Sequence, residues 1–140
     1  MRKLLSRIHL GLSWLAVGAI VAQFFLAGLG IFGVASFRAH ATNGELIALG
    51  SLLLLALALA GRLGWVRIGF SALLVALTVV QALLPQGPPL VAALHPLNAL
   101  LVLGVAVNLA RLGMRSTGRQ RVAGNAASTA DLAMSGGQTR

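Results

Sequence analysis

The chain has 140 residues, of which 58% are hydrophobic and 9% are charged, and its formal net charge is +9. So few charged side chains cannot cover a water-soluble globule of this length, and the composition is therefore that of a membrane protein. The absence of cysteine excludes disulfides, thiolate-bound clusters and a covalently attached haem. No nucleophile stands beside a base and no phosphate-binding loop is present, which argues against a hydrolytic enzyme.

Four stretches without charge follow one another along the chain, and each predicts a membrane-spanning helix. A span needs roughly 20 apolar residues, and only helices or closed barrels satisfy their backbone in lipid. None of the runs alternates polar with apolar residues, which excludes a barrel. We therefore expect an all-α transmembrane four-helix bundle over residues 1–112, with helices at about 8–36, 41–61, 66–84 and 90–111. Pro88, Pro89 and Pro96 leave a second possibility for the last helix, a separate interfacial turn over residues 88–94.

The N-terminus has the outline of a secretory signal peptide, because RKLLSR precedes an apolar run and Ala39-His40-Ala41 has the form of a cleavage site. However, the uncharged run from Ile8 to Phe37 is far longer than the roughly 7–15 residues of a signal core. We therefore expect the first helix to stay in the bilayer uncleaved.

The basic residues predict the orientation of the bundle. All Lys and Arg residues except Arg38 fall on one side of the predicted helices. The positive-inside rule then places both termini in the cytoplasm, in a multi-pass protein of a bacterial cytoplasmic membrane. Topology accounts for the net charge, so the expected partner is the lipid bilayer and not nucleic acid. Residues 113–140 lack an apolar period and predict a disordered cytoplasmic tail.

The sequence contains an internal repeat. Gly11-x-Ser13, with Gln23 ten residues on, returns 58 residues later as Gly69-x-Ser71 with Gln81, and His40-x-x-Asn43 returns 55 residues later as His95-x-x-Asn98. Each copy is one hairpin of two helices. Two tandem hairpins of equal topology predict a pseudo-two-fold axis along the membrane normal, with both histidines near the outer face.

This symmetry predicts a shared ligand between the two histidines. Bundle cores commonly hold cofactors, and two neutral imidazoles complete the coordination of a haem iron without a thiol. His40 and His95 are thus the candidate metal ligands, and Arg38 can pair with propionates. The amides of the repeat can orient ligands or loops: Gln23, Asn43, Gln81 and Asn98. Small residues would leave room for the flat ring: Ala27, Gly28, Gly30, Gly33, Gly44, Ala48 and Gly50.

Simpler interpretations stay open. The two H-x-x-N pairs can be helix caps, and Ser71, Thr78 and Gln81 can hold helices together. A non-haem metal site with Glu45 is weaker, because an ideal helix turns Glu45 about 140° away from His40. His9 is excluded as a ligand, since it lies on the cytoplasmic side and Arg67 occupies the equivalent position.

Two resemblances follow from these residues. The run from Gln23 to Gly30, then His40 and the segment Leu94-His95-Pro96-Leu97-Asn98, resembles an uncharacterised family of small bacterial four-helix membrane proteins over about residues 8–112. The layout also resembles one half of haem A synthase, which implies axial roles for His40 and His95. Phe37 stands where the synthase half that performs the chemistry carries a Glu, which argues against that reaction.

The sequence therefore predicts a protein that binds one b-type haem for electron transfer to or from a quinone or a membrane redox partner. It would be a redox carrier more than an enzyme. The alternative function is a cofactor-free structural or accessory subunit of a membrane complex.

Overall fold

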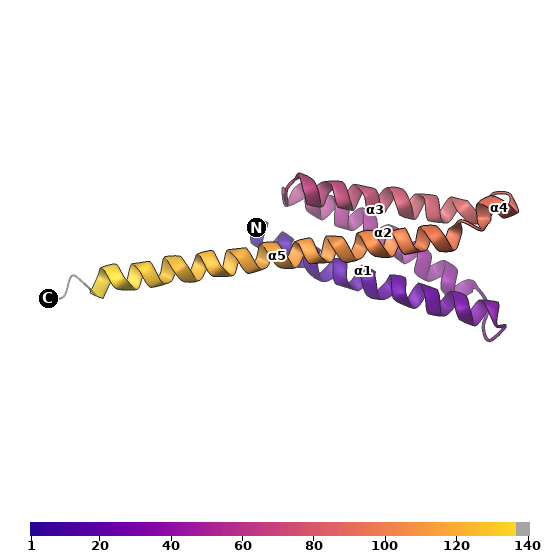
Figure 1. The fold of residues 1–140 in the computed structure, drawn as a ribbon, viewed down its shortest axis with the longest axis horizontal. Coiled ribbons are helices and arrows are strands. Elements are labelled where there is room, and N and C mark those ends of the chain that lie inside the picture. Colours follow the sequence, from indigo (N-terminus) through magenta and orange to yellow (C-terminus); the bar gives the residue numbers. More distant parts are fainter. Residues whose placement is uncertain (137–140) are drawn as a thin grey trace.

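The computed structural model describes the backbone of residues 1–136 and the side chains up to residue 116 and at 118. In this part of the chain, four helices are long and apolar enough to cross a membrane, as the composition predicted. The long helices are α1 (Arg2–Ile31), α2 (Arg38–Ala60), α3 (Trp65–Leu83) and α5 (His95–Gly136) (Figure 1). Two short helical turns lie between α3 and α5, and the third and fourth spans include them. The described residues contain no strand.

The four helices form a ring. Helix α1 packs against α2 and α5, and α3 packs against the same two helices. The helices that carry the repeated histidines, α2 and α5, therefore stand at opposite corners. The connection between α1 and α2 and the turns that precede α5 lie at the same end of the bundle (Figure 1). We call this end of the bundle the histidine end. The other end holds the N-terminus and the connection from α2 to α3.

Two helices end in the same hydrogen-bonded turn. After α1, the N–H of Gly33 donates to Gly30 O at 3.2 Å and that of Val34 to Leu29 O at 2.9 Å. Gly33 has φ +70°, the left-handed conformation that such a helix end requires. After α2 the same pair of bonds forms, but Arg62 takes the left-handed position with φ 45°. A residue with a Cβ is strained in this conformation.

The connection from α3 to α5 is irregular because of its prolines. The 3₁₀ turn η1 (Leu84–Gln86) and the short helix α4 (Pro89–Ala92) come before α5, which begins at His95. Proline has no N–H to donate and is accepted in the first turn of a helix. This confirms the separate turn that the sequence left open, and it places His95 in the first turn of the last helix.

Helix α5 is longer than predicted. It continues to Gly136 and projects beyond the bundle (Figure 1), so residues 113–136 are helical in the structure where a disordered tail was predicted. Ala and Arg have high helix propensity, and no proline interrupts this segment. The last predicted tail residues, 137–140, lie outside the described residues, as do the side chains of Arg119 and Arg121.

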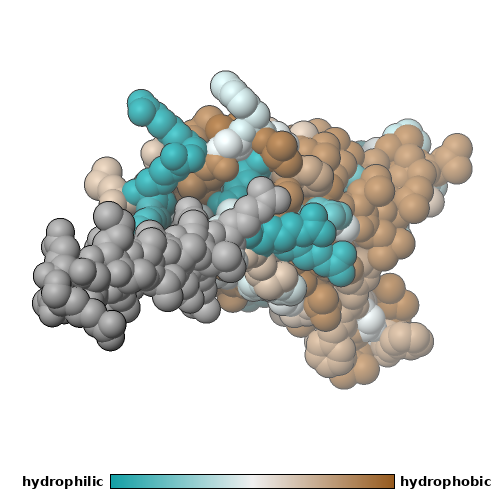
Figure 2. Space-filling model, turned by 60° about the vertical axis from the view of Figure 1, so that its left-hand side comes forward, coloured by the Kyte–Doolittle hydropathy of each residue, from teal (hydrophilic) through white to brown (hydrophobic). Residues whose placement is uncertain are grey.

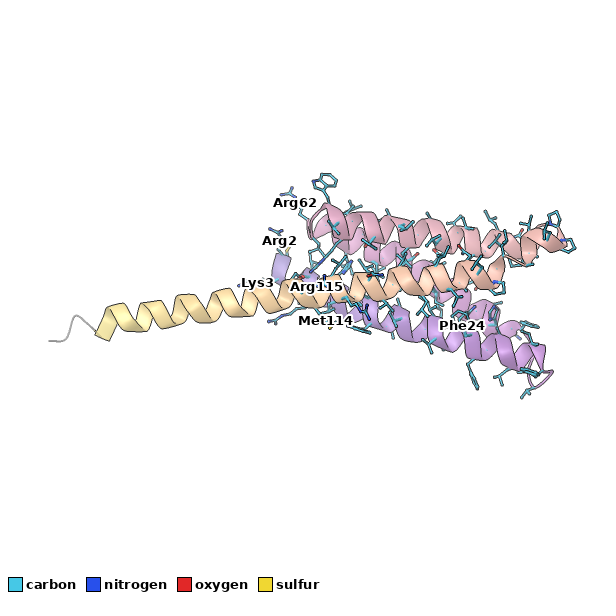
Figure 3. The ribbon with its side chains drawn as sticks, viewed as in Figure 1. Arg2, Lys3, Phe24, Arg62, Met114 and Arg115 are labelled. Carbon is cyan, nitrogen blue, oxygen red and sulfur yellow. The ribbon has the colours of Figure 1, made fainter. Side chains whose placement is uncertain are left out.

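The core is thin and the outer surface is apolar, as expected for helices in lipid. Leu54, Leu74 and Leu109 are among the largest fully buried side chains. Many large apolar side chains are exposed instead, and they cover most of the face seen in Figure 2. Arg2, Lys3, Arg62 and Arg115 gather at the end opposite the histidine end, which we call the basic end (Figure 3). The charge asymmetry read from the sequence therefore separates the two ends of the bundle.

Candidate functional site

A cavity of about 730 Å³ lies in the half of the bundle toward the histidine end. Its walls come from all four long helices and from the turns η1 and α4. This volume is within the range of cofactor and ligand sites, and most of its lining is apolar with few polar groups, as in such sites. Both predicted ligands, His40 and His95, line it, and so do Gln23 and Gln81.

The two imidazoles lie close together in the lining of the cavity. The ring centroids of His40 and His95 lie 6.2 Å apart, and their planes are inclined by 52°. Both side chains are partly buried. Two residues separated by 55 positions in the chain are thus brought to one site from opposite corners of the ring.

In the first hairpin, a glutamine on α1 holds the histidine on α2. Gln23 Nε2 donates to His40 O at 2.8 Å, and His40 Nδ1 lies 3.2 Å from Gln23 O. Asn43 Nδ2 donates to Gln23 Oε1 at 2.6 Å and to Ala19 O at 2.9 Å. The asparagine therefore fixes the glutamine amide, and the glutamine fixes the backbone and the ring of the histidine.

The second hairpin repeats these bonds atom for atom. Gln81 Nε2 donates to His95 O at 3.1 Å, and His95 Nδ1 lies 3.0 Å from Gln81 O. Asn98 Nδ2 donates to Gln81 Oε1 at 2.6 Å and to Leu77 O at 3.0 Å. One contact is added, because Gln81 Nε2 also lies 3.0 Å from His95 Nε2. The repeat in the sequence thus corresponds to a repeat in hydrogen bonding.

These bonds fix the tautomer of both neutral imidazoles. A backbone carbonyl can only accept, so the Nδ1 of His40 and of His95 must carry the proton. The Nε2 atom of each ring then carries the lone pair, and in His95 this lone pair accepts a hydrogen bond from the Gln81 amide. Histidines that bind metals commonly donate their other ring N–H to a carbonyl, which orients the ring and raises its basicity.

Other predicted residues lie beside the cavity. Asn43 and Arg38 line a second, shallower hollow, so neither is a wall of the main cavity. Asn98 is buried and acts on His95 through Gln81. Of the small residues expected to make room, Ala27, Gly44 and Ala48 line the cavity. The others do not line it: Gly28, Gly30, Gly33 and Gly50.

Two residues that were not among the predicted site residues also line the cavity. Phe37 contacts His40 edge to face, with ring centroids 6.0 Å apart, and its ring fills the space beside Gly30. Glu45 also lines the cavity, although helix geometry predicted that it would point away from His40. Residues from more than one face of α2 line the cavity. The angle between His40 and Glu45 on an ideal helix therefore did not predict whether both would line it. No three His, Asp or Glu side chains in the described part of the chain could together hold a metal ion, which gives no support to the non-haem alternative.

The basic end contains a polar cluster that the sequence analysis did not assemble. His9 is fully buried, with Nε2 3.4 Å from Ser71 Oγ. Arg67 is also buried, and it donates to Ser6 Oγ at 3.0 Å and to Leu112 O at 3.3 Å. The internal repeat could have indicated this cluster. Ser13 and Ser71 are equivalent positions, and they follow His9 and Arg67, respectively, by one helical turn. The cluster joins α1, α3 and α5.

Residues 23–87, somewhat less than half of the chain, match the sequence model of a family of unknown function, DUF6220. The matched segment contains Gln23, His40, Asn43 and Gln81, and it ends before His95. The expected resemblance to an uncharacterised family is therefore supported over this shorter range. Comparison with curated proteins and with solved structures gave no match. The likeness to haem A synthase stays a prediction.

Proposed function

We propose that this protein binds one b-type haem between His40 and His95 and carries electrons in a membrane, as a redox carrier more than an enzyme. The observation that carries the proposal is the 6.2 Å separation of the two imidazole centroids. A metal ion held by two imidazole nitrogens at about 2 Å each separates the ring centroids by about 6 Å. Nδ1 is the donor in both rings, so Nε2 is the atom of each ring that would bind the iron, and in His95 the iron would replace the hydrogen bond from the Gln81 amide.

The lining of the cavity supports the pseudo-two-fold axis that the proposal requires. An offset of 58 residues relates three pairs of lining residues, and an offset of 55 relates five more. They include His40 with His95, Gln23 with Gln81 and Ile47 with Val102. A porphyrin is flat and close to symmetric, and an axis through its iron would suit a site lined in equivalent pairs. The tandem hairpins would then each supply one ligand together with its hydrogen-bonded clamp.

In this proposal, Gln23 and Gln81 hold the ligand rings and keep their Nδ1 protons in place. Asn43 and Asn98 donate hydrogen bonds to those glutamines, so they would affect the haem only through the glutamines and the histidines. Arg38 lies at the same end of the bundle, in the neighbouring hollow, and would pair with a propionate there. The haem supplies a one-electron couple when bound, and the chain supplies its ligands and its apolar pocket.

The proposal includes a location. The basic end carries the N-terminus and Arg2, Lys3, Arg62 and Arg115 (Figure 3), so the positive-inside rule favours a cytoplasmic basic end. The histidine end would then face the outside of a bacterial inner membrane. Electrons would pass there to or from a quinone or a membrane redox protein, with no role for nucleic acid.

One observation favours the alternative of a cofactor-free accessory subunit. Each glutamine, histidine and asparagine of the two networks already has hydrogen-bond partners inside its own hairpin. Such groups stabilise helix pairs in membranes without any cofactor. This alternative does not explain the cavity between the two hairpins.

The test is the absorption spectrum of the protein purified in detergent from cells with an ample haem supply, oxidised and then reduced with dithionite. His40→Ala and His95→Ala are expected to lose the low-spin spectrum or convert it to high spin. His9→Ala, at the opposite end of the bundle, is the control and keeps the wild-type spectrum. Size-exclusion profiles and far-UV circular dichroism report folding of each variant. A folded, colourless wild-type protein overturns the proposal and favours the accessory subunit.

A further inference from the structure

The two histidines of the cavity differ in the contacts of their Nε2 atoms. Gln81 Nε2 lies 3.0 Å from His95 Nε2, in addition to the bonds that both hairpins share. Gln23 makes no equivalent contact, and within the described residues no hydrogen bond reaches Nε2 of His40. The site therefore contains one histidine whose lone pair accepts from an amide and one whose lone pair has no hydrogen-bond partner.

A second difference lies three residues before each histidine. Phe37 contacts the His40 ring edge to face, with centroids 6.0 Å apart, and a Cβ on Gly30 would meet the same phenyl ring at 2.8 Å. The phenyl ring thus lies between α1 and His40. The equivalent of Phe37 in the second hairpin is Ala92, which also lines the cavity. The wall of the second hairpin therefore has a methyl group where the first hairpin has a phenyl ring.

These differences favour the release of His95, and not of His40, from a bound metal ion. A neutral imidazole has one lone pair in its ring plane, which binds a metal or accepts a hydrogen bond. When His95 leaves the metal, its Nε2 can accept from the Gln81 amide again. Nε2 of a released His40 would be unpaired in a mostly apolar cavity. The net contribution of one hydrogen bond corresponds to a factor of about five in the equilibrium constant.

The phenyl ring of Phe37 acts in the same direction. Edge-to-face aromatic pairs are stabilising beyond the apolar area that they bury, so the contact holds the His40 imidazole in its place. Ala92 cannot hold His95 in this way, because it has no ring. Both differences therefore leave His40 as the more firmly held of the two histidines.

We propose that His95 is an exchangeable ligand, and that a small, neutral diatomic molecule replaces it at the haem iron while His40 stays bound. The proposal rests on the haem function above. In the exchange, the bond between His95 Nε2 and the iron breaks, and the incoming molecule donates a lone pair to the iron. Gln81 then donates its amide N–H to His95 Nε2 again. No electron or proton is transferred, so the protein would bind this molecule in addition to carrying electrons.

The lining of the cavity favours a ligand of this class. Among the described residues, no Lys or Arg side chain lines it, and an anion would meet the carboxylate of Glu45 instead. The remaining walls are mostly apolar, and burying a charge beside them is costly. A molecule of two heavy atoms is also smaller than the imidazole that it replaces. Carbon monoxide is the probe, because it is uncharged and binds reduced haem iron.

The test adds carbon monoxide to the haem-loaded protein after reduction with dithionite. Wild type is expected to bind it at a rate that reaches a limit at high concentration, because His95 must first leave the iron. His95→Ala should bind it without this limit. Ala92→Phe introduces the ring of the first hairpin into the second and should lower the affinity for carbon monoxide about fivefold. Phe37→Ala, the reciprocal change beside His40, should not lower it.

Infrared spectroscopy of the bound carbon monoxide identifies the side on which it lies, since the C–O stretching frequency depends on the polar groups beside it. Gln81→Leu is expected to shift this band more than Gln23→Leu, the equivalent change in the first hairpin. Each substitution removes the bonds to a histidine carbonyl and from an asparagine amide, so the two are matched in what else they disturb.

The two proposals fail differently. A colourless protein overturns the haem proposal before any carbon monoxide is added. A reduced, haem-loaded wild type whose spectrum does not change under carbon monoxide overturns the exchange of His95 and leaves haem binding intact. A C–O band that shifts more in Gln23→Leu than in Gln81→Leu also overturns it, because His40 would then be the ligand that is replaced.

Discussion

Replacing Asn98 by leucine tests whether the repeated network stabilises the bundle. Asn98 is 7% exposed, and its amide donates to Leu77 O and to Gln81 Oε1. Leucine has a similar shape and no donor, so the substitution removes both bonds with little change in packing. The variant is expected to unfold more readily than wild type.

The expected loss of stability depends on whether each acceptor keeps another hydrogen-bond partner after the substitution. Leu77 O lies within α3 and can keep its helical partner, so losing that bond costs about 0.6 kcal/mol, the average for side-chain hydrogen bonds in a membrane protein. Gln81 Oε1 loses the bond from Asn98 and becomes an unpaired acceptor, which costs about 1–3 kcal/mol. The free energy of unfolding should therefore fall by about 1.6–3.6 kcal/mol.

The assay is equilibrium unfolding in mixed micelles, with SDS as the denaturant and helicity as the signal. Asn108→Leu is the matched control, because Asn108 lies on the same helix, is exposed and bonds only to Gly104 O one turn earlier. This variant should be neutral or slightly stabilised. If Asn98→Leu is as harmless as Asn108→Leu, the network does not stabilise the fold and the reasoning fails.

Two further predictions concern backbone positions. A Cβ on Gly30 would lie 2.8 Å from the Phe37 ring, so Gly30→Ala should displace this half-exposed ring and lose part of the stability that alanine otherwise adds to a helix. Gly28→Ala meets nothing within 4 Å and should stabilise by about 0.5–1 kcal/mol. Equal thermal stabilities of the two variants would contradict the Phe37 contact. Arg62→Gly should relieve the left-handed strain and stabilise by about 1 kcal/mol, while Arg62→Ala, which keeps a Cβ, should give no gain in the same melting experiment.

The sequence predicted the helices well because lipid imposes a simple rule on them. Charge-free apolar runs have few alternatives in a bilayer, so the four spans could be placed from composition alone. Their ends were less accurate, since α1 begins at Arg2 and includes basic residues that sequence analysis assigned to a flanking segment. Long cationic side chains can extend to the interface while their backbone stays helical.

The lining of the cavity was predicted in part. The repeat brought His40 and His95 to one cavity with Gln23 and Gln81, because residues in equivalent positions of two similar hairpins meet similar surroundings. It did not predict the direction of each side chain. Arg38 and Asn43 face a neighbouring hollow, and Glu45 lines the main cavity, since these details depend on where helices separate.

A fully buried apolar layer separates the polar groups of the two ends. Leu54 and Leu74 are 0% and 1% exposed, and they come after the Ser51–Thr78 contact on the way from the cavity to His9 and Ser71. Such a layer has no hydrogen-bonding atoms in its side chains and acts as an electrical insulator. The polar groups that line the cavity and those around His9 therefore have no continuous hydrogen-bonded path between them along this part of α2 and α3.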